Sequence, residues 1–544
     1  MTTSTTIMSS VPWLTILGVI PLVGSLLVAF VPGSALMAKR LALGVSLLTL
    51  VVGVVAALQF DRGSSAQFQL GEQYSWIPQF GVSYALGVDG IALVLILMSL
   101  VLTPICLLAA WRDLPEDDAA DERRVKTYFA LLLLLETFMV GVFAATDVFL
   151  FYVFFEAMLI PVYFLIGRFG GARRQYAAMK FLLFSLAGGL VMLVAVIALY
   201  IQGPGGTDGF LVERLTGLSI DPTTERLMFV GFFIAFAIKA PMVPFHTWLP
   251  DAATESSPAT ATLLVGVLDK VGTFGMIRFC LQLFPEASHW ATPVVVVLAV
   301  VSVLYGALLA IGQTDMMRLI AYTSVSHFGF IVLGIFAFTT TGGAGSTLYM
   351  VNHGFSTAAL FLFAAMVVRR GGSKRIPDYG GWQRVTPGLA GIFLVAGLSA
   401  LSLPGLSTFV SEFLVLVGSF PTRPAAAVIA TAGIILAALY VLLMYKRVMT
   451  GPKPESLAAD GVTVDDAWRK SSGGVRGFEL PSGRRIVDLT TREKLVAAPL
   501  IAAFLVLGFF PNLALNAINP AVDKSMSHVQ NTPAAGNAAE GSTR

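Results

Sequence analysis

Several ionisable side chains lie inside long apolar stretches of this sequence, where a charge is costly. Lys239 is the clearest example, because it stands in FVGFFIAFAIKAPMVPF and is followed at once by Pro241 and Pro244. An ammonium group at the bilayer centre costs on the order of 3 kcal/mol by insertion scales. A proline in a helix interior also removes a backbone hydrogen bond. These features predict a broken helix that holds a titratable charge, and the chemistry of such a group is proton transfer.

Four further groups form two pairs of equal predicted depth. Glu136 and Glu156 each lie ten residues from a turn near Thr146, about 15 Å deep at 1.5 Å per residue. His327 and His353 flank a later turn in the same way. Two carboxylates could bind or pass a proton, and imidazole can relay one because its two nitrogens can accept and donate. Bundle hydroxyls or water could instead satisfy the carboxylates, and a lone buried histidine is often structural.

The remaining candidate site residues lie next to a predicted helix break or within one apolar span that contains several charged residues. Lys270 stands in LLVGVLDKVGTFGMIRF, and Glu412 follows a second break at Pro404-Gly405. Intramembrane ionisable residues of this kind are functional candidates by default. Arg278 lies nearer the external end of its span and better fits a structural role. His246 and Asp251, in PFHTWLPDA, are placed at a cytoplasmic mouth, where protons could enter or a loop could be anchored.

Composition places these groups in a multi-pass membrane protein. The 544 residues are 56% hydrophobic and 12% charged, whereas soluble domains carry about 25% charged residues. Cys106 and Cys280 lie in apolar runs without nearby cysteine partners, so neither a disulfide framework nor a metal site is indicated. The N-terminal stretch has no basic region or convincing cleavage site, and we expect the first apolar segment to be retained.

Apolar run lengths predict an all-α polytopic protein. A hydrocarbon core about 30 Å thick needs roughly 20 apolar residues in a helix. By this rule we expect fourteen transmembrane helices, the twelfth of which is too long for one straight span. The predicted spans lie near residues 11–31, 37–58, 90–111, 126–145, 147–168, 178–202, 227–247, 259–283, 289–311, 316–339, 345–369, 388–420, 424–448 and 495–516.

Basic residues predict the orientation. The odd-numbered loops carry 26 Lys and Arg residues, whereas the even-numbered loops and the two termini carry six. Because cytoplasmic loops are enriched in Lys and Arg, we expect the odd loops inside and both termini outside. Residues 449–494 form a predicted polar cytoplasmic insertion, and residues 523–544 form a tail that we expect to be disordered.

The two broken spans predict an internal repeat. They are five spans apart, so residues 126–283 and 284–448 each place the broken helix fourth among five helices. Because five is odd, the second group enters the membrane from the opposite side, which is the inverted-repeat architecture of many transporters. Residues 1–125 then supply three peripheral helices, and residues 495–522 supply the last helix.

At this point five segments of the sequence resemble a known family, the antiporter-like membrane subunits of respiratory complex I. The resemblance spans about residues 85–450 and is nearest to the chain M subfamily, which is related to mitochondrial subunit four and to subunits of multisubunit Na⁺/H⁺ antiporters. The segments are FYVFFEAMLIPVYFLIGRFG, AFAIKAPMVPFHTWLPDAATESSP, QTDMMRLIAYTSVSHFGF, VNHGFSTAALFLF and LPGLSTFVSEFLVLVGSF.

The resemblance implies a function and a set of residue roles. The chain would be a proton-translocating subunit of NADH-quinone oxidoreductase in the bacterial plasma (inner) membrane, with Glu156 paired to Lys239. FMN, the iron–sulphur clusters and the quinone site would be in partner subunits, with no cofactor in this chain. The implied partners are chains L and N, the small membrane subunits and the long lateral helix of chain L. The implied proton relay consists of Glu156, Lys239, Lys270, His327, His353 and Glu412, with Glu136 as an accessory acid.

Two departures from the family pattern and two other functions remain open. Ala253 stands where the family has a histidine, and Met317-Arg318 replaces a basic pair. The same motifs would also suit a subunit of a multisubunit Na⁺/H⁺ antiporter. A membrane scaffold without transport is a third interpretation, which replacement of Lys239 or Glu412 by Ala would test.

Overall fold

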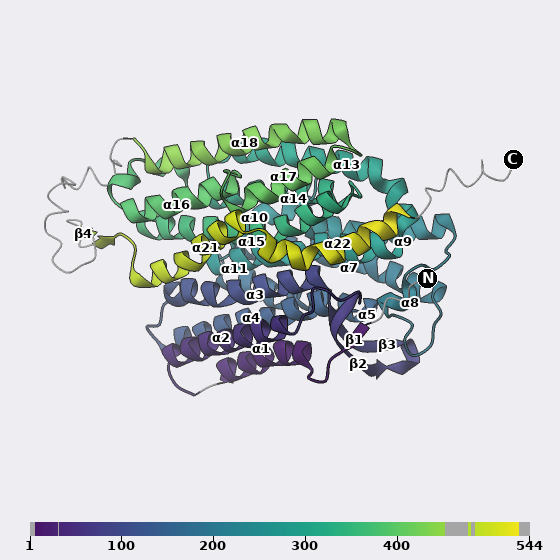
Figure 1. Ribbon diagram of the computed structural model, residues 1–544. Helices are drawn as coiled ribbons and strands as arrows, with labels where there is room; N and C mark the ends of the chain where they lie inside the picture. Colours follow the sequence, from purple (N-terminus) through teal and green to yellow (C-terminus); the bar gives the residue numbers. More distant parts are fainter. Residues whose placement is uncertain (1–5, 31, 452–476, 480–484, 532–544) are drawn as a thin grey trace.

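The computed structural model describes residues 6–30, 32–451, 477–479 and 485–531. It is predominantly helical, with most helices running side by side along one direction (Figure 1). Ten described helices, some of them interrupted, are long and apolar enough to cross a membrane, or up to eleven if one bent pair counts as a span. The ten are α1 (Trp13–Phe30), α2 (Ala35–Leu58), α3 with its 3-10 extension (Gly90–Arg112), α4 (Ala119–Ala144), α5–α6 (Val148–Phe169), α7 (Arg174–Gln202), α13 (Pro285–Ile311), α14 (Met316–Ile335), α15 (Thr340–Gly371) and α18 (Pro424–Met449).

The other predicted spans coincide with helices that are shorter, broken or bent. They are α9 (Pro222–Lys239) with α10 (Trp248–Glu255), α11 (Pro258–Leu263) with α12 (Lys270–Gly275), α16 (Pro387–Ala400) with α17 (Ser407–Ser419), and α21 (Thr491–Phe509) with α22 (Asn512–Gln530). Short connecting helices are η1 (Pro78–Phe80), η2 (Ala110–Arg112), α8 (Val212–Leu215), η3 (Phe245–Thr247), η6 (Ile376–Asp378) and η7 (Trp382–Arg384).

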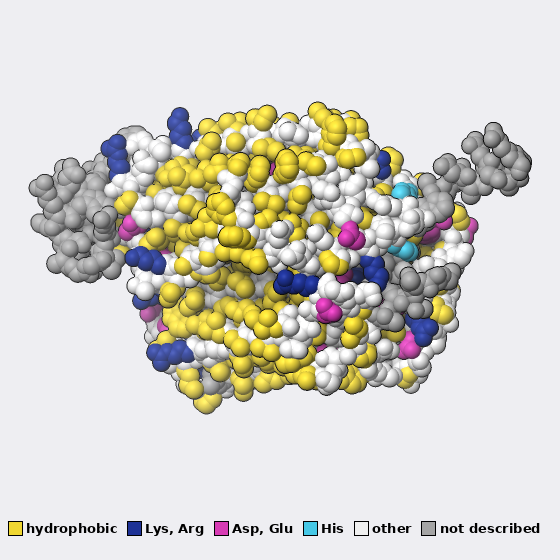
Figure 2. Space-filling model, in the orientation of Figure 1, with side chains coloured by type: hydrophobic (Ala, Val, Ile, Leu, Met, Phe, Trp, Pro, Cys, Tyr) yellow, Lys and Arg dark blue, Asp and Glu magenta, His cyan; other side chains and the backbone are white. Residues whose placement is uncertain are grey.

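The outer surface of the bundle suits a lipid environment. Figure 2 shows hydrophobic side chains over much of one face. Val194 of α7 and Ile435 of α18 are 69% and 71% exposed, although both are strongly apolar. Inside the bundle, α14 and α15 are almost wholly buried. The bundle thus has apolar side chains both on its outer surface and in its interior. The exposed ones are stable only when hydrocarbon surrounds the bundle.

Both predicted breaks are confirmed, and each has a local cause. α9 ends at Lys239, and Pro241 and Pro244 occupy the gap before α10. A proline has no N–H for the helical ladder and clashes with the preceding turn. α16 ends at Ala400, and the gap before α17 contains Pro404 and Gly405, whose φ is +92°. That backbone conformation favours glycine.

Two further irregularities were not predicted. α5 (Val148–Ala157) and α6 (Leu159–Phe169) are separated at Met158, where Pro161 cannot bond the carbonyl of Ala157. The π-helical segments η4 (Leu264–Leu268) and η5 (Met276–Leu281) lie on either side of α12. Such π segments are rare and occur often at functional sites.

The chain is predominantly helical, as predicted, but two small sheets depart from the all-α prediction. β1 (Thr6–Met8), β2 (Phe68–Ile77) and β3 (Val82–Val88) form a sheet in the order β1-β2-β3. β1 pairs parallel to β2, and β2 pairs antiparallel to β3, with Tyr74 opposite Tyr84. β4 (Gly477–Glu479) and β5 (Arg485–Val487) form a second, two-stranded sheet. The length of an apolar run identifies membrane helices only. The β2–β3 hairpin lies in the loop between α2 and α3, so run length could not predict it.

The C-terminal prediction also needs correction. α21 and α22 replace the expected helix at 495–522 and are bent by 66° to each other. Residues 523–530, expected in a disordered tail, belong to α22, and the side chains of Met526 and Val529 are buried. α22 packs on α3 and α15 along its apolar side. Residues 532–544 and most of the predicted insertion at 449–494 lie outside the described residues.

Candidate functional site

Lys270 and His353 are in direct contact in the middle of the protein. Lys270 Nζ lies 2.7 Å from His353 Nδ1 and donates to the Val265 carbonyl oxygen at 2.6 Å. An ammonium group can only donate, so His353 Nδ1 accepts when Lys270 is charged. His353 Nε2 then carries the proton and faces the Thr357 hydroxyl oxygen at 3.0 Å. The predicted involvement of both residues in one site therefore agrees with their geometry.

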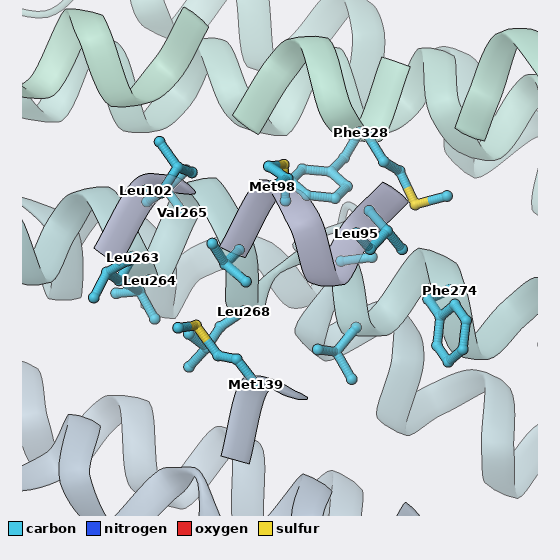
Figure 3. Packing of buried hydrophobic residues seen from close by; sticks show 14 of the residues in the cluster. Leu95, Met98, Leu102, Met139, Leu263, Leu264, Val265, Leu268, Phe274 and Phe328 are labelled. Carbon is cyan, nitrogen blue, oxygen red and sulfur yellow. The ribbon is translucent and has the colours of Figure 1, made fainter. Parts of the chain in front are cut away.

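The surroundings of this contact are apolar. Lys270 and His353 have no exposed surface, and the Phe328 ring centre lies 5.1 Å from Lys270 Nζ. Figure 3 shows the dense packing nearby, with Met98 of α3, Leu268 of η4 and Phe328 of α14. A charge here depends on the few polar atoms that reach it, because an unpaired charge in such a setting is strongly disfavoured.

His327 continues the line from His353. The centres of the two imidazole rings are 5.2 Å apart. His327 Nδ1 lies 2.6 Å from the Tyr349 hydroxyl, and His327 Nε2 lies 3.3 Å from the Tyr440 hydroxyl. The predicted juxtaposition of the histidines agrees with the structure, whereas both tyrosines were missed. Tyr349 lies four residues before His353 on α15 and so shares its helix face, a spacing that could have identified it.

Glu412 lies beside the second break and is deeply buried. Neither of its carboxylate oxygens has a hydrogen-bond partner within the part of the chain that the structure describes. The Ser402 hydroxyl, also without a partner there, is near enough to interact with this carboxylate. Asn352 of α15 donates to the Ser407 carbonyl at 2.7 Å and so holds α17 in place. Buried polar atoms of this kind are normally satisfied by water or by another ligand.

Lys239 and Glu156 lie close together without a direct bond. No salt bridge within 4.0 Å joins them among the described side chains, so the implied contact pair is not formed. Lys239 Nζ is buried without a hydrogen-bond partner and faces the rings of Phe155 and Phe181 at 5.2 and 5.4 Å. The Glu156 carboxylate occupies space left by Gly189 of α7, where an added Cβ would lie 1.6 Å from Glu156 Oε1.

The first break positions Lys239. The residue ends α9, where the negative end of the helix dipole favours a cation. Trp248, the first residue of α10, donates its indole N–H across the gap to the Ile238 carbonyl at 2.9 Å. The two halves of the broken helix are therefore joined at the residue preceding the lysine.

The two buried lysines lie on helices that pack directly together. A Cβ added to Gly272 of α12 would lie 2.5 Å from the Phe236 carbonyl and 2.6 Å from the Ala240 nitrogen. Asp269, fully buried and without a hydrogen-bond partner in the described chain, interacts electrostatically with both Lys239 and Lys270. Asp269 was not predicted as a site residue, although its position next to Lys270 at membrane depth was a usable signal.

Glu136 remains separate from these contacts. It is fully buried on α4, and both of its oxygens lack hydrogen-bond partners in the ranges that the structure describes. No hydrogen bond within those ranges links it to Glu156, so the two carboxylates of the predicted pair have different surroundings.

At the predicted cytoplasmic mouth, Asp251 is an anchor. Its carboxylate accepts from Lys180 of α7 at 2.7 Å and from Arg318 of α14 at 2.6 Å. Both oxygens are thus engaged by cations, which favours the anchoring interpretation over a path for protons. His246 is buried between the rings of Tyr305 and Tyr322, and its Nδ1 has no hydrogen-bond partner within the described residues.

Arg278 has the structural setting expected of it, and its side chain is almost fully buried. It forms a salt bridge of 2.7 Å with Asp89, and 5% of its side chain is exposed. Cys106 and Cys280 are buried free thiols. In the described ranges, no group of three or more His, Cys, Asp and Glu side chains could hold a metal ion.

Comparisons with known proteins show the family of the chain. A family model described as "NADH:quinone oxidoreductase/Mrp antiporter, TM" matches residues 145–438. NADH-quinone oxidoreductase subunit M of Mycobacterium tuberculosis is 49% identical over 97% of this chain and 96% of its own length. The subunit M of Rhodobacter capsulatus is 37% identical over 94% and 95%. NADH-ubiquinone oxidoreductase chain 4 of Arabidopsis thaliana is 34% identical over 93% and 96%.

Solved structures share the fold. A chain of respiratory complex I from Thermus thermophilus with bound NADH superposes with a TM-score of 0.81 and 30% identity, covering 95% of this chain and 99% of that one. A chain of the Mrp complex from Dietzia gives a TM-score of 0.80 at 23% identity, covering 95% and 98%. At that identity the second match concerns the fold alone.

Proposed function

Because the chain belongs to the membrane-subunit family shared by NADH:quinone oxidoreductases and Mrp antiporters, we propose that it is the chain M type, proton-translocating subunit of a bacterial NADH-quinone oxidoreductase. The observation that carries this function is the row of buried groups at the centre of the bundle, in which the hydrogen-bonded pairs Lys270–His353 and His327–Tyr349 meet through imidazole rings whose centres are 5.2 Å apart. The chain is then part of an enzyme whose redox chemistry takes place in other subunits.

The relay follows these contacts. Groups within about 2.6–3.2 Å can exchange protons directly, which describes Lys270–His353 and His327–Tyr349. Glu156 and Lys239 form the input side with Asp269, and Glu136 is an accessory acid. Glu412 is the terminal carboxylate from which protons leave. His246 is the group that receives protons from the cytoplasm, whereas Asp251 holds α10.

The energy for this transfer comes from outside the chain. Moving one proton against 100 mV costs about 2.3 kcal/mol. FMN, iron–sulphur clusters and the quinone site are assigned to partner subunits, which transmit the energy through chains L and N, the small membrane subunits and the lateral helix of chain L. A change in a neighbouring charge near Glu156 would alter the electrostatic balance at Lys239.

The proposed architecture has fourteen passes in a bacterial plasma membrane. Residues 126–283 and 284–448 form two inverted five-helix repeats, with residues 1–125 and the bent pair α21–α22 outside them. The breaks α9–α10 and α16–α17 support this division. The distribution of Lys and Arg supports external termini.

A lysine replacement tests the function. We expect Lys270→Met in the whole complex to assemble but to lower proton pumping per NADH oxidised at least about tenfold, a loss equivalent to about 1.4 kcal/mol of barrier. The measurement is acidification of proteoliposomes during NADH oxidation. Lys446→Met, which removes an exposed lysine of α18, is the matched control.

Each alternative function has its own outcome in this experiment. Undiminished pumping by an assembled Lys270→Met complex would contradict the relay. Proton movement that depends on Na⁺ and needs no NADH would instead support the antiporter subunit that the family description also covers. The scaffold interpretation would be supported if Lys270→Met reduced the amount of assembled complex but the complexes that did assemble pumped the normal number of protons per NADH oxidised.

A further inference from the structure

A polar cavity opens at the end of the bundle that carries the β1–β3 sheet. Its volume is about 600 Å³, and it lies between the loop before β2, the start of α3, η5 and the outer side of α22. A polar cavity of this volume is large enough to hold water. Its polar lining includes Asp61, Gln69, Asp89, Arg278, Lys524 and His528.

Arg278 forms the inner wall of this cavity. Its guanidinium lies 2.7 Å from Asp89 and stacks near the rings of Phe68 and Phe274, at 4.6 and 5.3 Å from their centres. Asp89 is itself fixed, because it caps α3 by accepting from the Ala92 N–H at 2.8 Å. The arginine is thus held by one carboxylate and two aromatic rings and has little freedom to move.

The same arginine lies between the cavity and Lys270. Lys270, Phe274 and Arg278 are spaced by four residues, which places them along one side of a helix. Phe274, which packs edge-on against Phe143 and lies 5.3 Å from the Arg278 guanidinium, stands between Lys270 and the arginine that lines the cavity.

We propose that the cavity faces the external side, where the Lys and Arg count places the loop before β2, and that Arg278, held by Asp89, Phe68 and Phe274, is a plug that prevents protons in this cavity from reaching Lys270. The proposal rests on the proposed function, because a plug is needed only if Lys270 handles protons. A guanidinium group is not deprotonated in proteins, so unlike Lys or His it cannot pass a proton inwards. Fixed arginines also act as electrostatic barriers to protons in membrane pores.

A double replacement tests the plug. Asp89→Asn/Arg278→Gln removes both charges together, so that neither is left unpaired, and asparagine retains the helix cap. We expect passive proton flux into proteoliposomes containing the whole complex, without NADH, to rise about tenfold over wild type, equivalent to about 1.4 kcal/mol of barrier. Phe274→Ala should also raise the passive proton flux.

The control removes an arginine from a comparable ring contact away from the cavity. Arg226 lies 5.3 Å from the centre of the Trp290 ring, and Arg226→Gln should leave the passive flux at the wild-type value. If the wild-type complex pumps protons and the double variant leaks no faster than wild type, the plug is overturned. If the wild-type complex does not pump at all, the proposed function itself fails.

A labelling experiment tests the location of the cavity. Ser525 lines it, whereas Cys106 and Cys280 have no exposed surface. Ser525→Cys should react with a membrane-impermeant maleimide added to the external side of intact cells, and the parent protein should not. Reaction only from the cytoplasmic side would overturn the assignment of the cavity to the outside.

Discussion

At the scale of single residues, the site depends on which partner each buried charge has. Lys270 has a histidine nitrogen and a carbonyl oxygen within 2.7 Å. Lys239 has aromatic rings and no hydrogen-bond partner among the described residues. A buried ammonium group without a hydrogen-bond partner is less favourable than one with partners. Lys239 is thus suited to respond to a change in charge, and Lys270 to pass a proton to His353.

Gly189 provides a residue-scale prediction. An added Cβ would lie 1.6 Å from Glu156 Oε1, so Gly189→Ala must displace the carboxylate. Alanine favours a helix by about 1 kcal/mol over glycine, and we expect normal assembly together with proton pumping reduced several-fold. Gly44→Ala, at a site where an added Cβ meets nothing within 4 Å, should pump as wild type does. If both variants pumped protons equally well, the proposed role of Glu156 on the input side of the relay would be contradicted.

At the scale of elements, the breaks and π segments position the charges. α9 stops at Lys239, α12 begins at Lys270 between two π segments, and α17 carries Glu412 just after a break. Interrupted helices release backbone polar groups where the protein interior or a wet cavity can satisfy them. In the described structure, Trp248 satisfies one such group, the Ile238 carbonyl.

Trp248 therefore offers an element-scale prediction. Trp248→Phe keeps an aromatic ring but leaves the buried Ile238 carbonyl without its donor, which costs about 1–3 kcal/mol. We expect α9 and α10 to move more freely at Lys239 and pumping per NADH to fall, with subunit assembly unchanged. Hydrogen exchange of residues 236–248 would report the motion. Trp290→Phe, at a half-exposed site, should change neither quantity.

At the scale of the whole molecule, one carboxylate joins the two halves of the bundle. α10 packs against both α7 and α14, and Asp251 bonds a cation from each. Because α7 and α14 belong to different proposed repeats, Asp251 fixes how those repeats sit at the predicted cytoplasmic side.

Asp251→Asn tests this connection. The variant leaves Lys180 and Arg318 without a carboxylate in a partly buried setting, and we expect a loss of about 1–3 kcal/mol in stability. Thermal inactivation of the complex should shift to lower temperature. Asp221→Asn, which retains a capping side chain at the exposed start of α9, should not shift it. An unchanged inactivation profile for Asp251→Asn would contradict the anchoring role.

The sequence by itself determined the features that depend on local chemistry. Run length and polarity identified the apolar helices, and the prolines after Lys239 and before Glu412 predicted the two breaks, because a missing N–H ends a helix wherever it occurs. The same local rules missed the β1–β3 sheet and the helical residues 523–530, whose stability comes from pairing and from packing on α3 and α15.

Only the tertiary structure decided which charges meet. Lys270 and His353 are 83 residues apart, and Arg318 and Asp251 are 67 apart. Equal depth was the argument for Glu136 with Glu156 and for His327 with His353. Depth is only one coordinate, and contact also requires the rotation and neighbours of each helix. Those are set by side-chain packing between helices, which is why the tyrosine partners of His327 and the Asp89–Arg278 salt bridge emerged only from the folded chain.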